Sequence, residues 1–255
     1  MSHFIGIDIG STCAKTVVMD QDENIVFHEL QPTGWSSIDT AEAIEKQLAE
    51  KQFAPSDGNV VATGYGRISV PYADKCVTEI SCHANGACHI FENPNLTVID
   101  IGGQDTKIIE VRDGMVTDFI MNDKCSAGTG RFLEVMANTL SVKPDQLCEM
   151  AAQGGDTSIS SMCTVFAESE VISLIGRGES RENIAFAVVD SIVKKVLSQV
   201  SRLQIAGSTV VMTGGLSGFT NLRESLAKQL GNEVKYSELG HYAGAIGAAL
   251  YARKL

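Results

Sequence analysis

The sequence lacks several features that would assign the chain to a particular class of protein. No apolar stretch approaches the ~18 residues of a membrane-spanning helix. The N-terminus leads straight into strand-like sequence rather than into a basic segment with a cleavage site. The net charge of −11 makes nucleic acid an improbable partner. We therefore expect a soluble, cytoplasmic protein that binds neither membranes nor nucleic acid.

The spacing C-x-x-C is also absent, although cysteine is frequent for a reducing compartment. Its absence argues against a zinc ribbon and against an iron–sulfur cluster held by one chain alone. Without an export signal, structural disulfides are not expected, so metal binding and redox chemistry stay open beside simple burial. The cysteines are Cys13, Cys76, Cys82, Cys88, Cys125, Cys148 and Cys163.

What the sequence does contain is a duplicated motif. FIGIDIGSTCAKTVVMD at 4–20 is matched by LTVIDIGGQDTKIIEVR at 96–112. In register, Ile7, Asp8, Ile9, Gly10 and Lys15 recur as Ile99, Asp100, Ile101, Gly102 and Lys107. Each copy is an apolar run, an aspartate, a tight turn and a second apolar run, which is the pattern of a β-hairpin. Two such hairpins facing each other could bind a polyphosphate and its metal ion.

The residues of the two turns suit that role. Turn N–H groups and hydroxyls of Gly10, Ser11 and Thr12 could bind phosphate, and Lys15 could add a positive charge. The second turn offers Gly102, Gly103 and Gln104, and Asp105 adds a carboxylate. Mg²⁺ usually takes one or two carboxylates together with waters, and Asp8 and Asp100 would supply them across a cleft.

The remaining pattern predicts an α/β fold with mixed sheets in two lobes. We expect strands at 3–9, 14–20, 24–30, 59–63, 97–101, 106–111, 115–121 and 208–212. We expect helices near 38–52, 79–91, 130–140, 144–153, 164–176, 182–205, 219–230 and 242–253. The predicted lobes are 1–92 and 93–255, and the last helix, rich in Gly and Ala, is a candidate to pack back on the first lobe. At 210–219, a strand runs into a glycine turn where Gly214 and Gly215 would let the backbone approach an adenosine closely.

The chain thus contains two predicted phosphate hairpins followed by a glycine turn. This order of motifs resembles that of the superfamily of acetate and sugar kinases, Hsp70 and actin. NDKCSAGTGRFLEVMA at 122–137 and MCTVFAESEVISLIGRG at 162–178 narrow the resemblance. They are similar to the ATP-dependent activators of 2-hydroxyacyl-CoA dehydratases, a family related to the ATPase subunits of benzoyl-CoA reductase. TGYGR at 63–67 and TEISCHANGA at 78–87 also resemble that group. The resemblance implies a two-lobed, actin-like (ribonuclease H-like) ATPase fold with the nucleotide cleft between the lobes.

Two cysteines precede predicted helices, and the resemblance gives them a role. A thiolate next to a helix N-terminus is stabilised by the helix dipole, which suits Cys125 and Cys163. One chain offers only these two ligands, whereas a [4Fe–4S] cluster takes four. The resemblance implies one cluster per homodimer, on the two-fold axis, held by both cysteines of each chain. The alternative is that the two cysteines are buried in separate environments.

The resemblance further implies an ATP-hydrolysing electron-transfer activator. A ferredoxin or flavodoxin would reduce the cluster, and hydrolysis of ATP would drive one low-potential electron to a dehydratase. Mg²⁺, the turn amides and Lys15 would spread the charge that develops on the phosphates, while Asp105 or Gln104 orders the attacking water. The ligands would be ATP and ADP with Mg²⁺.

Two other classes of function remain open from the sequence. One is a small-molecule kinase of the same superfamily, with Asp105 as general base, although 255 residues leave little room for a substrate-binding insertion. The other is a non-enzymatic, nucleotide-dependent regulatory protein. Cys76, Cys82, Cys88 and Cys148, with His83 and His241, are expected to be structural. Cys13 could lie near the nucleotide, and Glu168 and Glu170 are expected to complement the dipole of the helix after Cys163.

Overall fold

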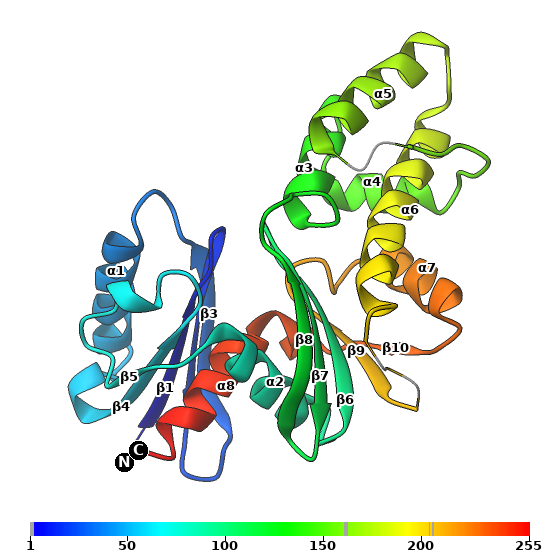
Figure 1. The fold of residues 1–255 in the computed structure, drawn as a ribbon. Helices are drawn as coiled ribbons and strands as arrows, with labels where there is room; N and C mark the ends of the chain where they lie inside the picture. Colours follow the sequence, from blue (N-terminus) through cyan, green and yellow to red (C-terminus); the bar gives the residue numbers. More distant parts are fainter. Residues whose placement is uncertain (1–2, 161–162, 204, 206) are drawn as a thin grey trace. The chain divides into compact units, whose positions relative to one another are not determined.

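The computed structural model describes residues 3–160, 163–203, 205 and 207–255 (Figure 1). It has two mixed five-stranded sheets with helices packed on them, which confirms the predicted α/β fold. The chain divides into two compact units. The first comprises Met1–Asn95, Val111–Thr117 and Ser237–Leu255, and the second comprises Leu96–Glu110 and Asp118–Tyr236. The C-terminal segment thus belongs to the same unit as the N-terminal one.

The sheet of the first unit has the strand order β3-β2-β1-β4-β5. Strands β1 (His3–Ile9), β2 (Cys13–Met19) and β3 (Ile25–Pro32) form an antiparallel meander. Strands β4 (Gly58–Thr63) and the short β5 (Lys75–Cys76) continue it in parallel to β1. Because β1 and β4 are parallel, their C-terminal ends lie at the same edge of the sheet, and Asp8 pairs with Thr63 there.

Helices cover both faces of this sheet. On one face, α1 (Ser37–Glu50) packs Ala41, Ile44 and Leu48 against strand residues such as Ile7. On the other face, α8 (Ala243–Ala252) contacts β1 and also α2 (Glu79–Ile90). Glycines in all three elements explain the close packing, because a side chain at Gly6 of β1, Gly86 of α2 or Gly247 of α8 would collide with the backbone of the neighbouring element. Three 3₁₀ turns complete the unit: η1 (Pro55–Asp57), η2 (Arg67–Ser69) and η3 (Glu238–Tyr242).

The sheet of the second unit repeats the topology of the first. Its order, β10-β9-β6-β7-β8, matches β5-β4-β1-β2-β3 position by position. The strands are β6 (Leu96–Ile101), β7 (Thr106–Arg112), β8 (Met115–Asn122), β9 (Thr209–Thr213) and β10 (Val234–Lys235). Strand β9 pairs in parallel with β6, as β4 does with β1, and places Thr213 opposite Asp100. The sequence duplication therefore extends to the whole arrangement of the two sheets.

The second unit carries more helices than the first. They are α3 (Gly130–Thr139), α4 (Pro144–Ala151), α5 (Thr164–Gly176), α6 (Arg181–Val200) and α7 (Thr220–Leu230). Their core includes Phe132, Leu133, Val188 and Ile192, which pack with the sheet residue Ile99 in one cluster. Figure 1 shows α3 and α5 lying beyond the C-terminal end of β8, opposite the β7–β8 turn. No helix among the described residues is both long and apolar enough to cross a membrane.

Candidate functional site

Asp8 lies near the C-terminal end of β1, beside the backbone of two glycines, Gly64 and Gly244. Its side chain is 3% exposed, and Oδ1 accepts no hydrogen bond from the described residues. Gly64 and Gly244 leave the room around it, since a Cβ on either residue would lie 2.5 Å from an Asp8 carboxylate oxygen. A buried carboxylate oxygen without a donor is costly unless a cation or water completes it. This fits the predicted role of Asp8 as a magnesium-site carboxylate, which stays a prediction.

The first phosphate turn follows Asp8 directly. The amide of Gly10 donates to the carbonyl of Cys13 (3.1 Å), which closes the turn, and Ser11 and Thr12 at its tip are exposed. Thr33, the residue after β3, braces the turn by donating its hydroxyl to the Gly10 carbonyl (2.7 Å). The tip is therefore held rigidly while its polar groups stay accessible, as binding of phosphate requires.

The second phosphate turn has the same closure and an additional support. The amide of Gly102 donates to the carbonyl of Asp105 (2.9 Å), and Gln104 is exposed. The first amides of α3 then donate to the carbonyls of this turn, Gly130 to Gly102 (2.9 Å) and Arg131 to Gly103 (2.7 Å). The start of α3 is thus bonded to the turn.

The two lysines of the duplicated motif have different environments. Lys15 is half-buried and makes no ion pair within the described part of the chain. Lys107 is 1% exposed and lies between two carboxylates, with Nζ 3.2 Å from Asp100 and 2.9 Å from Asp105. Asp105 occupies the position of Cys13 in the first copy, so the second carboxylate exists only in the second motif. Lys107 neutralises charge inside its own unit, whereas Lys15 is available to a ligand.

In each unit, the strand parallel to the first one ends in a threonine that is followed by a glycine. Thr213 donates to Asp100 (2.9 Å), and Gly214 has φ +83° with its Cα against the same carboxylate. Thr63 and Gly64, with φ +82°, occupy the equivalent places beside Asp8. Gly215 is exposed, and a side chain there would meet nothing within 4 Å. Of the glycines after these two strands, the sequence pattern marked Gly214 and Gly215 as site residues but not Gly64. The Thr–Gly pair at the end of both apolar strands was a signal for Gly64 as well.

The two candidate cluster cysteines belong to the second unit, and each directly precedes one of two residues that are in contact. Cys125 lies in the loop that leads to α3, and Cys163 is the exposed N-cap residue of α5. The residues that follow them are in contact, with the hydroxyls of Ser126 and Thr164 2.7 Å apart. Among the described residues, no group of three or more His, Cys, Asp or Glu side chains could hold a metal ion. The predicted role of Cys125 and Cys163 as cluster ligands stays a prediction.

The other cysteines lie in environments of different kinds. Burial raises the pKa of the Cys82 and Cys148 thiols to about 12, which makes both unreactive near neutral pH. Burial also raises the pKa of Cys88, which is half-buried. Cys76 is exposed on the short edge strand β5, and Cys13 is half-buried at the start of β2. All seven cysteines are free.

The family of the chain follows from comparison with known proteins. Residues 5–252 match the BadF/BadG/BcrA/BcrD ATPase family. The chain belongs to this family. The chain is 46% identical over 255 residues to the (R)-2-hydroxyglutaryl-CoA dehydratase activating ATPase of Acidaminococcus fermentans, covering 99% of this chain and 97% of the relative. It is 42% identical over 253 residues to the activator of lactoyl-CoA dehydratase of Anaerotignum propionicum, covering 98% and 97%.

Solved structures agree with this assignment. The activator of 2-hydroxyisocaproyl-CoA dehydratase from Clostridium difficile with bound ADPNP superposes with a TM-score of 0.90 at 39% identity, covering 99% of this chain and 94% of that one. A ROK family glucokinase from Streptomyces griseus matches with a TM-score of 0.64 at 16% identity and covers 100% of both chains, which shows the fold alone. The expected actin-like ATPase fold is confirmed. As a member of this ATPase family, the chain is an ATP-binding ATPase.

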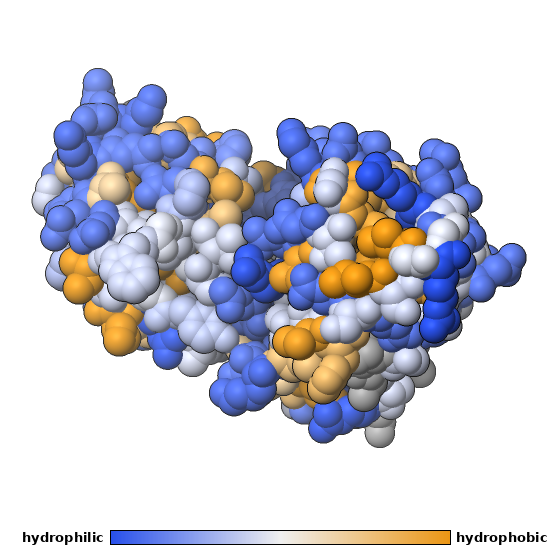
Figure 2. All heavy atoms as spheres, turned by 90° about the horizontal axis from the view of Figure 1, so that it is seen from above, coloured by the Kyte–Doolittle hydropathy of each residue, from blue (hydrophilic) through white to orange (hydrophobic). Residues whose placement is uncertain are grey.

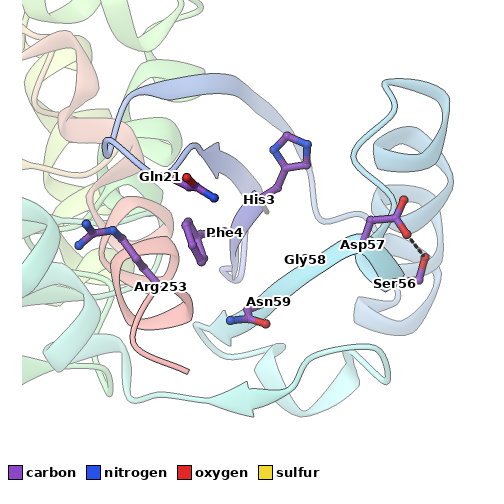
Figure 3. A pocket seen from close by; sticks show the side chains of 8 residues that line it. All are labelled: His3, Phe4, Gln21, Ser56, Asp57, Gly58, Asn59 and Arg253. Carbon is purple, nitrogen blue, oxygen red and sulfur yellow. Dashed lines mark hydrogen bonds between the residues drawn. The ribbon is translucent and has the colours of Figure 1, made fainter. Parts of the chain in front are cut away.

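A pocket of about 600 Å³ in the first unit of this ATPase lies away from the candidate site (Figure 3). It opens at the N-terminal ends of β1 and β4, whereas Asp8 and Gly64 lie at their C-terminal ends, roughly 17 Å along the strands. Its lining residues are His3, Phe4, Gln21, Ser56, Asp57, Gly58, Asn59 and Arg253. None belongs to the duplicated turns, so we assign no nucleotide to it.

Proposed function

We propose that the chain is an ATP-hydrolysing iron–sulfur activator that delivers a low-potential electron to a 2-hydroxyacyl-CoA dehydratase-type enzyme. The relatives named as dehydratase activators match over nearly the whole chain, which supports the activating role. The observation that carries the electron-transfer part is the pair Cys125 and Cys163, joined through the Ser126–Thr164 hydrogen bond at the start of α5. A bound [4Fe–4S] cluster would supply one-electron chemistry there, with one cluster per homodimer.

Each unit offers one buried aspartate and one phosphate turn to MgATP. Asp8 and Asp100 would supply carboxylates for Mg²⁺, and Gly10, Ser11 and Thr12 would donate to phosphate oxygens. Lys15 would add the positive charge, since Lys107 is already held by two carboxylates. In the second turn, Gly102, Gly103 and Gln104 would contribute in the same way, and Gly214 and Gly215 would lie against the adenosine.

The different environments of Gln104 and Asp105 support one of them over the other as the residue that orders the attacking water. Asp105 is 5% exposed and bonded to Lys107 at 2.9 Å, so its carboxylate is already occupied. Gln104, one residue earlier, is exposed at the tip of the turn. We therefore propose that Gln104 orders the attacking water and that Asp105 holds Lys107 in place. Hydrolysis then proceeds by positioning and charge neutralisation, as phosphoryl transfer generally does.

The surface of α5 supports a homodimer that shares the cluster. Val165, Phe166 and Ile172 are 67%, 68% and 56% exposed, and the first two directly follow the Cys163–Thr164 start of the helix. Figure 2, seen from above relative to Figure 1, shows hydrophobic surface exposed on the second unit. A second copy of the chain would cover such a patch, and a two-fold axis beside Cys163 would bring four thiols together. The electron donor would be a ferredoxin or flavodoxin.

Cysteine variants test the shared cluster directly. After anaerobic purification, Cys125→Ser and Cys163→Ser should each lose most of the iron and weaken the dimer while nucleotide binding persists. Cys76→Ser is the matched control, because Cys76 is also exposed but lies on β5 in the first unit. It should keep the wild-type iron content. Full iron in either of the first two variants would remove that residue from the set of ligands.

An aspartate variant separates the nucleotide site from the cluster. Asp8→Asn should reduce ATP hydrolysis strongly and leave the iron content unchanged, because Asp8 and the cysteines belong to different units. Turnover of ATP that depends on an added sugar or organic acid would instead favour a small-molecule kinase. Tight ATP binding with negligible turnover and no electron transfer would favour a regulatory protein.

A further inference from the structure

The loop that carries Cys125 is fixed by hydrogen bonds on both sides. This cysteine loop, residues 123–129, joins β8 to α3. The side-chain amide of Asn122 donates to the carbonyl of Cys125 (2.8 Å) and to that of Ala127 (3.2 Å). Within the loop, the hydroxyl of Thr129 donates to the carbonyl of Ser126 (2.6 Å). These bonds leave the loop little freedom to absorb a displacement of its ends.

One side of the cysteine loop is bonded to the second phosphate hairpin. Thr106, the first residue of β7, is fully buried and donates its hydroxyl to the carbonyl of Gly128 (2.7 Å). This bond acts beside the two backbone bonds from the start of α3 to the carbonyls of Gly102 and Gly103. The first copy of the motif has Ala14 at the position of Thr106 and therefore no hydroxyl to make such a bond. The connection belongs to the unit that contains the cysteines.

The other side of the cysteine loop is bonded to α5. The hydroxyls of Ser126 and Thr164 lie 2.7 Å apart, and each residue directly follows one of the two cysteines. Thr164 is the first residue of α5, so a shift of Ser126 acts on the end of the helix that carries Cys163. Thr139 of α3 also donates to Glu168 of α5 (3.3 Å), so the two helices are joined further along as well.

We propose that Thr106 and Ser126 are positioning residues that pass the state of the second phosphate turn to Cys125 and then to Cys163. Thr106 acts on the cysteine loop, and Ser126 passes the movement of that loop to α5. The inference rests on the proposed function, because it takes this turn as a phosphate site and these cysteines as cluster ligands. Coupling of this kind requires that ATP and ADP favour different arrangements of the turn.

The test measures the reactivity of each cysteine in the full-length chain after removal of its iron. Alkylation by iodoacetamide is followed by peptide mass spectrometry, which reports Cys125 and Cys163 separately. The rates are compared with Mg²⁺ and either ADP or a non-hydrolysable ATP analogue. In the wild-type chain we expect the rates at both cysteines to differ by roughly fivefold or more between the two nucleotides.

Isosteric variants then remove one connection at a time. Thr106→Val deletes the hydroxyl with little change in volume, and it should reduce the nucleotide dependence at both cysteines, although the backbone bonds from α3 to Gly102 and Gly103 remain. Thr106→Ser keeps the hydroxyl and should retain it. Ser126→Ala should reduce the dependence at Cys163 and leave it unchanged at Cys125, since the bond to Thr164 is lost while the Thr139–Glu168 bond remains. Ser126→Thr is its matched control. Nucleotide affinity is measured for every variant, so that loss of binding is recognised separately.

The outcomes distinguish this inference from the proposed function. The inference is overturned if Thr106→Val binds nucleotide and responds like the wild type, or if Ser126→Ala leaves Cys163 as responsive as before. It is also overturned if the wild-type chain binds both nucleotides and neither cysteine responds. An iron-free wild-type chain after anaerobic reconstitution contradicts the proposed function instead, whatever the alkylation rates show.

Discussion

Lys107 offers the sharpest test of the structure around the second motif. Replacing it with methionine keeps the length of the side chain and removes a charge that faces Asp100 and Asp105 at 3.2 and 2.9 Å. Both carboxylates are almost fully buried, at 2% and 5% exposure. Breaking a buried ion pair by removing one partner typically costs about 3–5 kcal/mol. Since Thr213 still donates to Asp100, we expect Lys107→Met to lose about 3 kcal/mol of unfolding free energy.

The matched control is Lys15, the same residue of the first copy. It is half-buried and unpaired within the described part of the chain, so Lys15→Met should change the unfolding free energy by no more than about 0.5 kcal/mol. Urea denaturation followed by circular dichroism measures both. Asp105→Asn combined with Lys107→Met should recover part of the loss, because one uncompensated charge disappears. Equal losses in the two single variants would refute the assignment of different roles to the two lysines.

Three further predictions concern other parts of the molecule. Burial raises the pKa of Cys82 and Cys148 from 9.0 to about 12, so both thiols should resist alkylation by iodoacetamide at about pH 8. The urea concentration at the unfolding midpoint should fall as the pH rises from 9.0 towards 12, because the two thiols ionise first in the unfolded chain. Gly214→Ala should lower the unfolding free energy by about 1–2 kcal/mol or more and weaken ATP binding, since φ is +83° and the new Cβ would lie 2.5 Å from a carbonyl oxygen of β6. Gly215→Ala, where the new Cβ meets nothing within 4 Å, should change the unfolding free energy by no more than about 0.5 kcal/mol in the same urea titration. Trp35 is 100% exposed on the segment bonded to the first phosphate turn, so its fluorescence should resemble that of tryptophan in water and change when MgATP is added.

The fold was predictable because its signals are local. The duplicated apolar runs and turns predict both meanders, and every predicted strand and helix is present in the structure. The boundaries are less well predicted: α6 ends at Val200, whereas its sequence pattern continues to about 205. The strands β5 and β10 were missed, because two residues are too few to form a periodic pattern.

From the sequence, a candidate site residue could be marked only where its neighbours in the chain form a recognisable motif. Local patterns marked Asp8, the glycine turns, Cys125 and Cys163, whose roles stay predictions; Cys163 does cap a helix, whereas Cys125 lies in the loop before α3 rather than at its first turn. The difference between Lys15 and Lys107 was not, because it depends on Asp105 standing where the first copy has Cys13. The Ser126–Thr164 bond joins positions far apart in the chain, and no local spacing reveals such a contact.

Iron, acid-labile sulfide and molar mass of the anaerobically purified protein test the central claim most directly. We expect about two irons per chain in a dimer, which corresponds to one four-iron cluster held by two chains. Its visible absorbance should bleach on reduction and return on oxidation. A monomer that stays free of iron after anaerobic reconstitution would contradict the account.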